Sequence, residues 1–395
     1  MSDAGRENRE RYLAHSINKL GLVEPLSEHL KRVALRSGVF AAPFGAEREG
    51  RAAGILHDLG KYRAEFQELL AGNREKSAET HHAIYGAAMA QARGWFSASF
   101  SIAGHHAGLH DRNQWQTMFD DPAYDAPTRA KSLLPLLEIE TGPLPDGTLS
   151  PAFLGENPHR AEFYTRMLFS CLVDADCLET EAFYAGKQRN PLLLIDHVDA
   201  LLKRLVDERD RKSREGPVNA VRHEIFDRCL AAAANPPGFF SLTVPTGGGK
   251  TLSAMAFALA HAKKWNLDRV IVVIPYLSII EQNAAEYRRI LDPENNGLVI
   301  EHHSAAPESE KGEGEERTTL DRAAENWDAP LVVTTSVQFV ESLFASSPSK
   351  CRKLHNVCRS VVVFDEAQTL PYRLLSPLLD VLRSLKENYH PFSLR

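Results

Sequence analysis

The distribution of apolar residues changes near residue 205, and this change limits the possible folds more than any other feature of the chain. Before that point apolar residues recur every three or four positions, a spacing that predicts amphipathic helices. After it, short runs rich in Val and Ile alternate with helical stretches, which indicates a parallel sheet covered on both faces. These runs are "GFFSLTV", "RVIVVIPY", "GLVIEHHS", "APLVVTTS" and "SVVVFDE".

The length and the charge pattern predict where this multidomain chain divides. A chain of 395 residues has room for two domains of ordinary size. Residues 207–221, "DERDRKSREGPVNAV", are dense in charge and contain Gly-Pro, which favours an exposed connection. We therefore expect an all-α domain at 1–205, a linker at 206–220, and an α/β domain with a mainly parallel sheet at 221–395.

The composition excludes several classes of protein. Lys and Arg number 46 against 52 Asp and Glu, and this net charge of −6 excludes nucleic-acid binding through overall basicity, though not through a local basic groove. The five cysteines include no CxxC pair, which is typical of reduced thiols. The polar N-terminus does not resemble a signal peptide, and no apolar run reaches the roughly 18 residues of a membrane span. We expect a cytoplasmic protein without a membrane partner.

The helical half is rich in candidate metal ligands. Residues 51–70, "RAAGILHDLGKYRAEFQELL", predict one amphipathic helix with His57 and Asp58 adjacent in its middle and Lys61 one turn later. The other candidates are His15, His81 or His82, the pair His105 and His106, and Asp174 or Asp176. Imidazole and carboxylate together suit divalent transition metals. His29 and His110 are interpreted as ordinary core or surface histidines.

Adjacent ligands favour two ions over one. Neighbouring side chains on a helix diverge by about 100°, so such pairs suit two metals that share a site better than a single tetrahedral ion. Asp58 would bridge the ions, with histidines on either side. Two ions about 3.5–4 Å apart can activate a water and stabilise both oxygens of a phosphodiester displacement. His57, Asp58 and Lys61 are therefore candidate catalytic residues, with Lys61 neutralising the phosphate.

A glycine-rich segment, "TVPTGGGKT", predicts a phosphate-binding loop in the second half. Its backbone N–H groups can surround phosphates, while Lys250 neutralises their charge and Thr251 reaches Mg²⁺. The candidate nucleotide ligands are Thr246, Gly247, Gly248, Gly249, Lys250 and Thr251. Val244 stands where the strict pattern has its first Gly, so the match is partial.

A second motif, "SVVVFDEAQ", supports this interpretation. It places Asp365 and Glu366 at the end of an apolar run, where a partner for Mg²⁺ and a base for the attacking water belong. Together the two motifs predict ATP and Mg²⁺ as cofactors, with Asp365 and Glu366 as catalytic residues.

Taken in order, "AHS", "HDLGK", "HAIYGA", "HH" and "DADCLE" resemble the motifs of the HD phosphohydrolase superfamily, with the best fit to the nuclease domain of the type I CRISPR-associated helicase-nuclease. The resemblance implies metal ligands at His15, His57, Asp58, His82, His105, His106 and Asp176. His82 is preferred over His81 because only His82 has Gly and Ala at the expected offset. Asp176 is preferred over Asp174 because it fits the "AD-x-L" pattern of HD enzymes.

The second half resembles the first RecA-like domain of superfamily-two DEAD/DEAH-type helicases. "VIPYLSIIEQ" and "VTTSVQFVESLF" look like the segments that line the path of a single strand in that family, which implies nucleic-acid contacts at Thr335 and Gln338. Short polar loops after strands are also common helix caps. The resemblance covers about residues 12–385. We expect the chain to be a fragment that ends after this domain, without the second RecA-like domain.

The resemblance implies a metal-dependent single-stranded DNA nuclease joined to an ATP-dependent helicase module, which degrades foreign DNA in CRISPR interference. The expected cofactors are two divalent transition ions (Mn, Co, Ni or Fe) and ATP with Mg²⁺. The expected partners are single-stranded DNA and the crRNA-guided surveillance complex, Cascade, with an anti-CRISPR inhibitor as a further candidate. The alternatives are an HD phosphohydrolase of nucleotides with a regulatory P-loop domain, and a non-enzymatic docking module.

Overall fold

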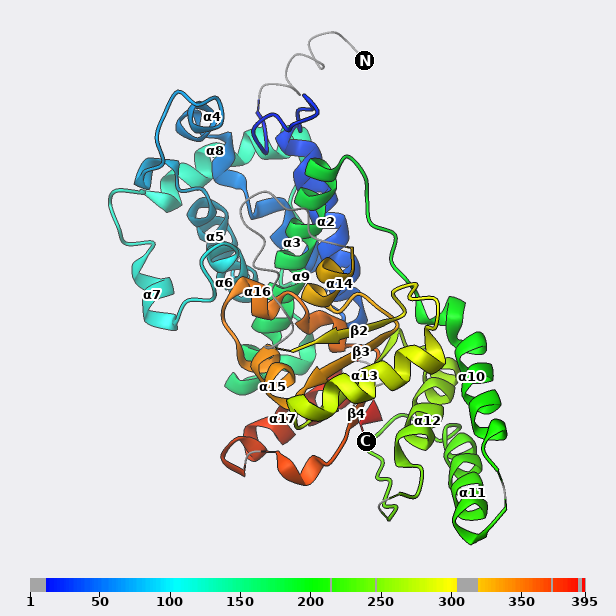
Figure 1. Ribbon diagram of the computed structural model, residues 1–395. Coiled ribbons are helices and arrows are strands. Elements are labelled where there is room, and N and C mark those ends of the chain that lie inside the picture. The colour runs from blue at the N-terminus through cyan, green and yellow to red at the C-terminus, as the bar shows by residue number, and fades with distance from the viewer. Residues whose placement is uncertain are drawn as a thin grey trace. The chain divides into compact units, whose positions relative to one another are not determined.

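The computed structural model describes residues 12–213, 215–245, 247–303, 319–370, 372–389 and 393–394. The chain forms two compact units. The first comprises residues 1–189 and 345–355, and the second comprises residues 190–344 and 356–395. The expected order, a helical part followed by an α/β part, is confirmed (Figure 1). None of the helices in the described ranges is long and apolar enough to cross a membrane.

The regular elements of the first unit, in its described part, are helices. They are α2 (Leu26–Ala41), α3 (Glu47–Leu56), α4 (Ala64–Leu70), α5 (Ala83–Ala92), α6 (Phe96–Gly104), α7 (Arg112–Thr117), α8 (Ala126–Thr141), α9 (Pro158–Ala185) and α16 (Pro348–Cys351). The long helix α9 packs against α2 and α6 through a buried apolar face. Helices α2 and α3 approach closely at Gly54, where a Cβ atom would lie 2.5 Å from the Cα of Ala34.

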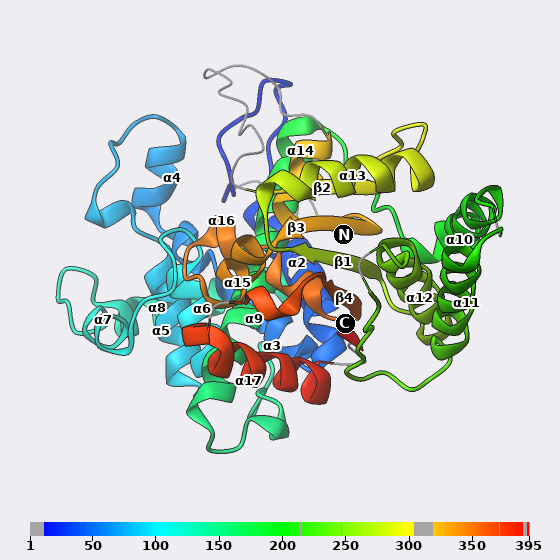
Figure 2. The ribbon, with the colours of Figure 1, turned by 60° about the horizontal axis from the view of Figure 1, so that its bottom comes forward.

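The second unit contains a five-stranded sheet in the order β2-β3-β1-β4-β5, and all its described pairings are parallel. The strands are β1 (Arg269–Ile274), β2 (Val299–His302), β3 (Leu331–Thr335), β4 (Ser360–Phe364) and β5 (Ser393–Leu394). Figure 2 shows β2, β3, β1 and β4 side by side. Every residue of β3 and β4 is buried, which explains why their sequences are continuous rather than alternating apolar runs.

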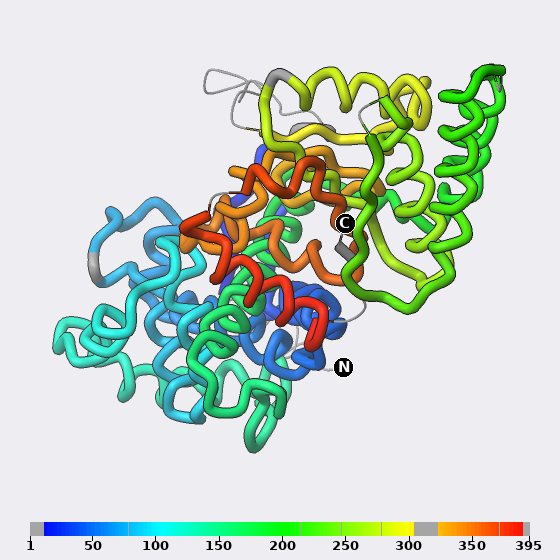
Figure 3. Tube along the Cα trace, turned by 90° about the horizontal axis from the view of Figure 1, so that it is seen from below, coloured from blue at the N-terminus to red at the C-terminus, as the bar shows by residue number. Residues whose placement is uncertain are grey.

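Helices surround the sheet. They are α10 (Leu194–Arg211), α11 (Pro217–Ala232), α12 (Lys250–Trp265), α13 (Leu277–Leu291), α14 (Thr319–Asn326), α15 (Ser336–Phe344) and α17 (Tyr372–Asn388). Of these, α12, α13, α14 and α15 contact its strands. Helices α10 and α11 follow one another along the chain, and both pack against α12 (Figure 3). Apolar residues of α10, α12 and α13 join those of β1, β3 and β4 in one core.

Two local features differ from the sequence-based expectations. Residues 206–220, expected as a linker, are largely helical, because α10 extends to Arg211 and α11 begins at Pro217. The charges there form contacts: Glu208 accepts a hydrogen bond of 2.7 Å from Arg289, and Arg209 lies over the ring of Phe226. The run "GFFSLTV", expected as a strand, contains no strand in the described residues, and Phe239 forms a single β-bridge.

Candidate metal centre and nucleotide-binding site

The helix expected at 51–70 is broken at the two residues of greatest chemical interest. Helix α3 ends at Leu56, His57 follows as its C-cap, and Asp58 precedes a 3-10 turn at Leu59–Tyr62. The sequence keeps its helical spacing of apolar residues across the break because α3 before it and α4 after it both bury apolar side chains in the first unit. His57 and Asp58 are fully buried in this turn.

Two glycines allow the first turn of α5 to approach this break. A Cβ atom on Gly60 would lie 2.4 Å from the carbonyl oxygen of His82, and one on Gly86 would lie 1.8 Å from that of Leu56. Only glycine fits such close backbone contacts. The glycines of the "HDLGK" and "HAIYGA" motifs therefore bring His82, the N-cap residue of α5, to Asp58.

Asp58 is the centre of the cluster, and its two carboxylate oxygens face different histidines. Oδ2 lies 3.1 Å from His57 Nε2 and 3.7 Å from His29 Nε2. Oδ1 lies 3.2 Å from His82 Nε2 and 3.7 Å from His105 Nε2. With this arrangement, the two oxygens of Asp58 could contact different ions.

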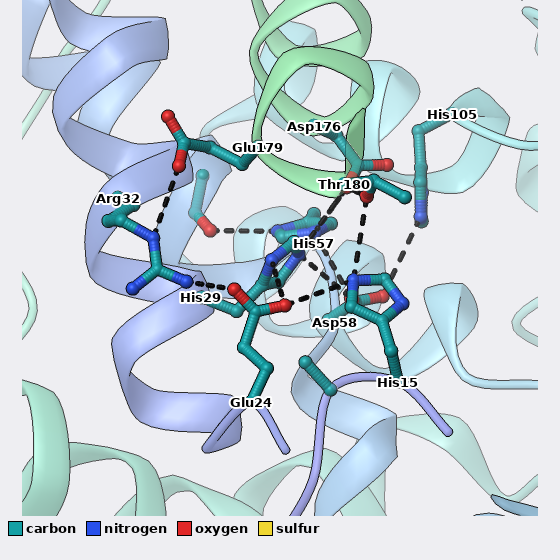
Figure 4. Close-up of polar contacts among 12 residues, drawn as sticks. His15, Glu24, His29, Arg32, His57, Asp58, His105, Asp176, Glu179 and Thr180 are labelled. Carbon is teal, nitrogen blue, oxygen red and sulfur yellow. Dashed lines mark hydrogen bonds and ion pairs between the residues drawn. The ribbon is translucent and has the colours of Figure 1, made fainter. Parts of the chain in front are cut away.

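Helix α9 places a second carboxylate, that of Asp176, beside this cluster. Its Oδ1 lies 3.4 Å from His29 Nε2 and 3.7 Å from His57 Nε2 (Figure 4). Asp174, the other candidate, is buried against Arg352, whose Nε lies 2.9 Å from its Oδ1. The geometry therefore supports the preference for Asp176.

His29 lies inside the cluster, although the sequence-based interpretation placed it among ordinary histidines. Its imidazole is fully buried, and both ring nitrogens lack a hydrogen-bond partner among the described residues. Glu24, which the sequence did not single out, lies 3.5 Å from its Nδ1. A signal was present: His29 shares a helical face with Leu26 and Val33, so its ring had to point into the core.

The buried atoms fit divalent ions. The Nε2 atoms of His29, His57 and His105, and Oδ1 of Asp58, are buried without hydrogen-bond partners among the described residues. Such orphaned atoms are costly unless a ligand satisfies them. Two groups of possible ligands share Asp58, one with His29 and His57 and the other with His82, His105 and His106. Nitrogen-rich sets of this kind suit transition metals.

The electrostatics leave several of these imidazoles neutral. Burial lowers the pKa of His82 to about 4, and the neighbouring His105 together with burial lowers the pKa of His106 to about 2. Burial would also lower the pKa of His57, but Asp58 and Asp176 raise it to about 10. A metal that binds His57 would therefore displace a proton. His82 and His106 are neutral, and their Nε2 atoms lie 2.9 Å apart, so one of them donates a hydrogen bond to the other.

The remaining sequence candidates occupy different surroundings. His15 lies 3.3 Å from Glu24 and belongs to a ligand group with Glu24 and His29, and burial lowers its pKa to about 3. His81 is exposed and belongs to none of these groups in the described residues. Lys61 is buried and pairs with Asp58 Oδ2 at 2.7 Å. Lys61 therefore neutralises Asp58 in this structure, and its contact with a phosphate stays a prediction.

The glycine-rich loop of the second unit leads into α12, as the P-loop interpretation requires. Gly247 and Gly249 both have φ of +80°, and Gly249 is the N-cap residue of the helix that begins at Lys250. Lys250 donates a hydrogen bond of 3.0 Å to Glu366 Oε1. Thr246 lies outside the described residues.

An open cavity of about 750 Å³ lies along this loop. Its lining includes Gly247, Gly249, Lys250, Thr251, Asp365 and Glu366. Burial and the adjacent Glu366 raise the pKa of Asp365, whereas the hydrogen bond from Lys250 lowers the pKa of Glu366. The two motifs, far apart in the sequence, thus meet at one cavity that can accept phosphates and Mg²⁺.

The two candidate nucleic-acid contacts lie at the junction of β3 and α15. Thr335 is buried, and its Oγ1 accepts a hydrogen bond of 3.2 Å from the backbone N–H of Gln338. The hydroxyl therefore caps the helix, the simpler of the two roles expected for such a residue. Contact with nucleic acid stays a prediction for both residues.

Comparison with known proteins identifies the class of each half. Residues 13–138 match the HD domain family, and residues 226–392 match the DEAD/DEAH box helicase family. Residues 13–138 are therefore similar to HD domains, and residues 226–392 are similar to DEAD/DEAH box helicase domains.

One curated relative and several solved structures show a more specific similarity. The chain is 29% identical over 208 residues to the CRISPR-associated nuclease/helicase Cas3 of Haloferax volcanii, which covers 48% of this chain and 22% of that protein. The crystal structure of T. fusca Cas3 matches 98% of this chain with a TM-score of 0.59 at 18% identity, over 49% of its own length. The ATP-bound T. fusca Cas3 matches with a TM-score of 0.61. The expected resemblance to the CRISPR helicase-nuclease family is confirmed, and the chain spans about half or less of each of these relatives.

Proposed function

We propose that the first unit is a nuclease that uses two divalent ions to cut single-stranded DNA, and that the second binds ATP and Mg²⁺ as a helicase module. The observation that carries the proposal is the position of Asp58 between two sets of histidines. The HD domain match and the similarity to a nuclease/helicase support the same activity. Recruitment by a crRNA-guided surveillance complex is part of the proposal, and such a complex is among the structures with a similar fold.

The residues of the chain would bind the ions and keep the metal-binding carboxylate ionised. Asp58 forms one ligand group with His29 and His57 and another with His82, His105 and His106, and His105 also lies within reach of His57 and Asp176. When bound, two ions would activate a water and stabilise the attacking and leaving oxygens of the phosphodiester. Lys61 keeps Asp58 ionised, since His57 and Lys61 hold the pKa of this carboxyl well below its usual range against the effect of burial.

The expected metals follow from the ligands. Imidazole nitrogen dominates the cluster, so Mn, Co, Ni or Fe should support activity better than Mg²⁺, which prefers an all-oxygen set. Strong activity with Mg²⁺ alone would contradict this part of the proposal.

The test is cleavage of circular single-stranded DNA by the metal-stripped chain, with each metal added in turn and with a chelator control. Cleavage that appears with a transition metal and disappears with the chelator supports the proposal. Hydrolysis of free nucleotides without DNA cleavage would favour the alternative, a nucleotide phosphohydrolase. Metal binding without either activity would favour a docking role.

A further inference from the structure

The histidines of the metal centre differ in the hydrogen-bond partner of Nδ1, the ring nitrogen that points away from the centre. His57 Nδ1 donates a hydrogen bond of 2.8 Å to the carbonyl oxygen of Gly54, and His105 Nδ1 donates one of 2.7 Å to that of Ile102. In the neutral imidazole these bonds fix the tautomer in which Nε2 carries the lone pair, which His57 reaches once its second proton is displaced. Each acceptor belongs to the turn that precedes its histidine.

His29 has no such backbone partner among the described residues. Its Nε2 faces Asp58 and Asp176, and the atom nearest to Nδ1 in the recorded contacts is Oε2 of Glu24, at 3.5 Å. Glu24 comes just before the N-cap residue of α2, and its backbone is fixed by a 2.9 Å hydrogen bond from the N–H of Ala14 to its carbonyl oxygen.

Half-exposed arginines hold the buried carboxylate of Glu24 in place. Arg32 donates to Glu24 Oε1 and, through Nε at 3.1 Å, to Glu179 on α9 (Figure 4). Arg36 donates to the other oxygen of Glu179 at 2.7 Å. Both carboxylates are only 3% exposed. Arg32 thus occupies one oxygen of Glu24 and leaves Oε2 directed at His29.

We propose that Glu24 is a positioning residue that accepts the Nδ1 proton of His29 and so prepares His29 Nε2 to bind metal. The inference rests on the proposed two-metal function. Metal-binding histidines almost always donate their second ring N–H to a carboxylate, carbonyl or water, and losing that partner typically costs about 10- to 100-fold in metal affinity. His15, 3.3 Å from the same oxygen, then contacts Glu24 rather than a third ion.

The experiment measures Mn²⁺ or Co²⁺ affinity and the number of bound ions for the metal-stripped full chain, by calorimetry and by the Co²⁺ absorption spectrum. Glu24→Ala should weaken one of two ions about 10- to 100-fold. Glu24→Gln should recover part of this loss, because its carbonyl oxygen can still accept from Nδ1. The matched control is Glu179→Gln, which disturbs the same arginine but touches no histidine and should leave affinity within about 3-fold, below the loss typical of such a partner.

Each outcome decides the matter. If the wild type binds no transition metal, both the proposed function and this inference fail. If it binds two ions and Glu24→Ala binds them equally well, the inference alone fails. Equal losses in Glu24→Ala and Glu179→Gln, with no recovery in Glu24→Gln, would show a general structural effect and overturn it. A third ion that Glu24→Ala abolishes would mean that His15, Glu24 and His29 are themselves a metal site.

Discussion

Arg352 binds Asp174 in the interior of the first unit, although 178 residues separate them in the sequence. Arg352 Nε and Nη2 lie 2.9 Å and 2.8 Å from the same carboxylate oxygen, and His355 Nε2 lies 3.6 Å from the other. Ser170, one turn before Asp174 on α9, lies with its Oγ 3.0 Å from His355 Nδ1. Residues 345–355, which follow α15 in the sequence, thus pack against α9 in the first unit. Their partner Asp174 is only two residues before Asp176.

Arg352→Met should therefore destabilise the first unit. Removing one partner of a buried ion pair typically costs about 3–5 kcal/mol, because the other charge stays in the interior. The free energy of unfolding, measured in urea, should fall by that order. Lys131→Met, at an exposed lysine on α8 of the same unit, should change it by only about 0.5 kcal/mol. Equal effects of the two substitutions would contradict this reading of the pair.

A fragment of residues 1–205 tests the same contact by deletion. It retains His15 to Asp176, all the candidate metal ligands, but it lacks Arg352 and His355. We expect this fragment to bind metal but to unfold at lower urea than the full chain. Adding a peptide of residues 345–355 should recover part of the difference. A fragment as stable as the full chain would show that the segment contributes nothing.

The features that could be predicted are those that depend on residues close together in the sequence. Continuous buried runs such as β3 and β4 are compatible with little except a parallel sheet, and Gly60 and Gly86 mark the close contact beside His82. His29 and Arg352 could not be found in this way. The helical face of His29 shows only that its ring points into the core, not that it meets Asp58 and Asp176, and a pair separated by 178 residues leaves no periodic trace.

The division of the histidines around Asp58 predicts the number of bound ions. His106 belongs only to the ligand group with His82 and His105, and it is exposed. His106→Ala should therefore remove one of two ions without unfolding the chain, as counted by native mass spectrometry with Mn²⁺. His110→Ala, nearby but outside these groups, should retain both ions. Two ions in the His106 variant would contradict the assignment.

Glu49 predicts how the stability of the first unit depends on pH. It is fully buried, and it accepts hydrogen bonds from Tyr164 at 2.6 Å and from Ser150 at 3.1 Å. Burial outweighs these bonds and raises the pKa of Glu49 above its unfolded value of 4.5. The folded state then binds the proton more tightly, so this carboxyl favours folding below pH 4.5 and loses that contribution as pH rises through the folded pKa.

Glu49→Gln removes this titration while keeping the shape of the side chain. The melting temperature of the variant relative to the wild type should therefore increase between pH 4.5 and pH 7.5. Glu28→Gln, an exposed carboxylate on α2, should give a difference that changes little with pH. A relative stability of the Glu49 variant that falls over this range would show that the carboxylate form is the favoured one.

The nucleotide site predicts that the two activities can be separated. Lys250 and Glu366 are 37% and 41% exposed, so their ion pair contributes little and a phosphate can displace Glu366 from Lys250. A hydrogen bond to a charged group contributes about 1.5–3 kcal/mol, so Lys250→Ala should weaken ATP binding about 10- to 100-fold. Fluorescent ATP titration measures this loss, with Lys263→Ala at the other end of α12 as the control.

The candidate ligands of the metal centre all lie in the first unit, so ATP-independent cleavage of single-stranded DNA should be the same in Lys250→Ala and in the wild type. Loss of that cleavage, with the metal content unchanged, would mean that the nuclease depends on the state of the nucleotide site.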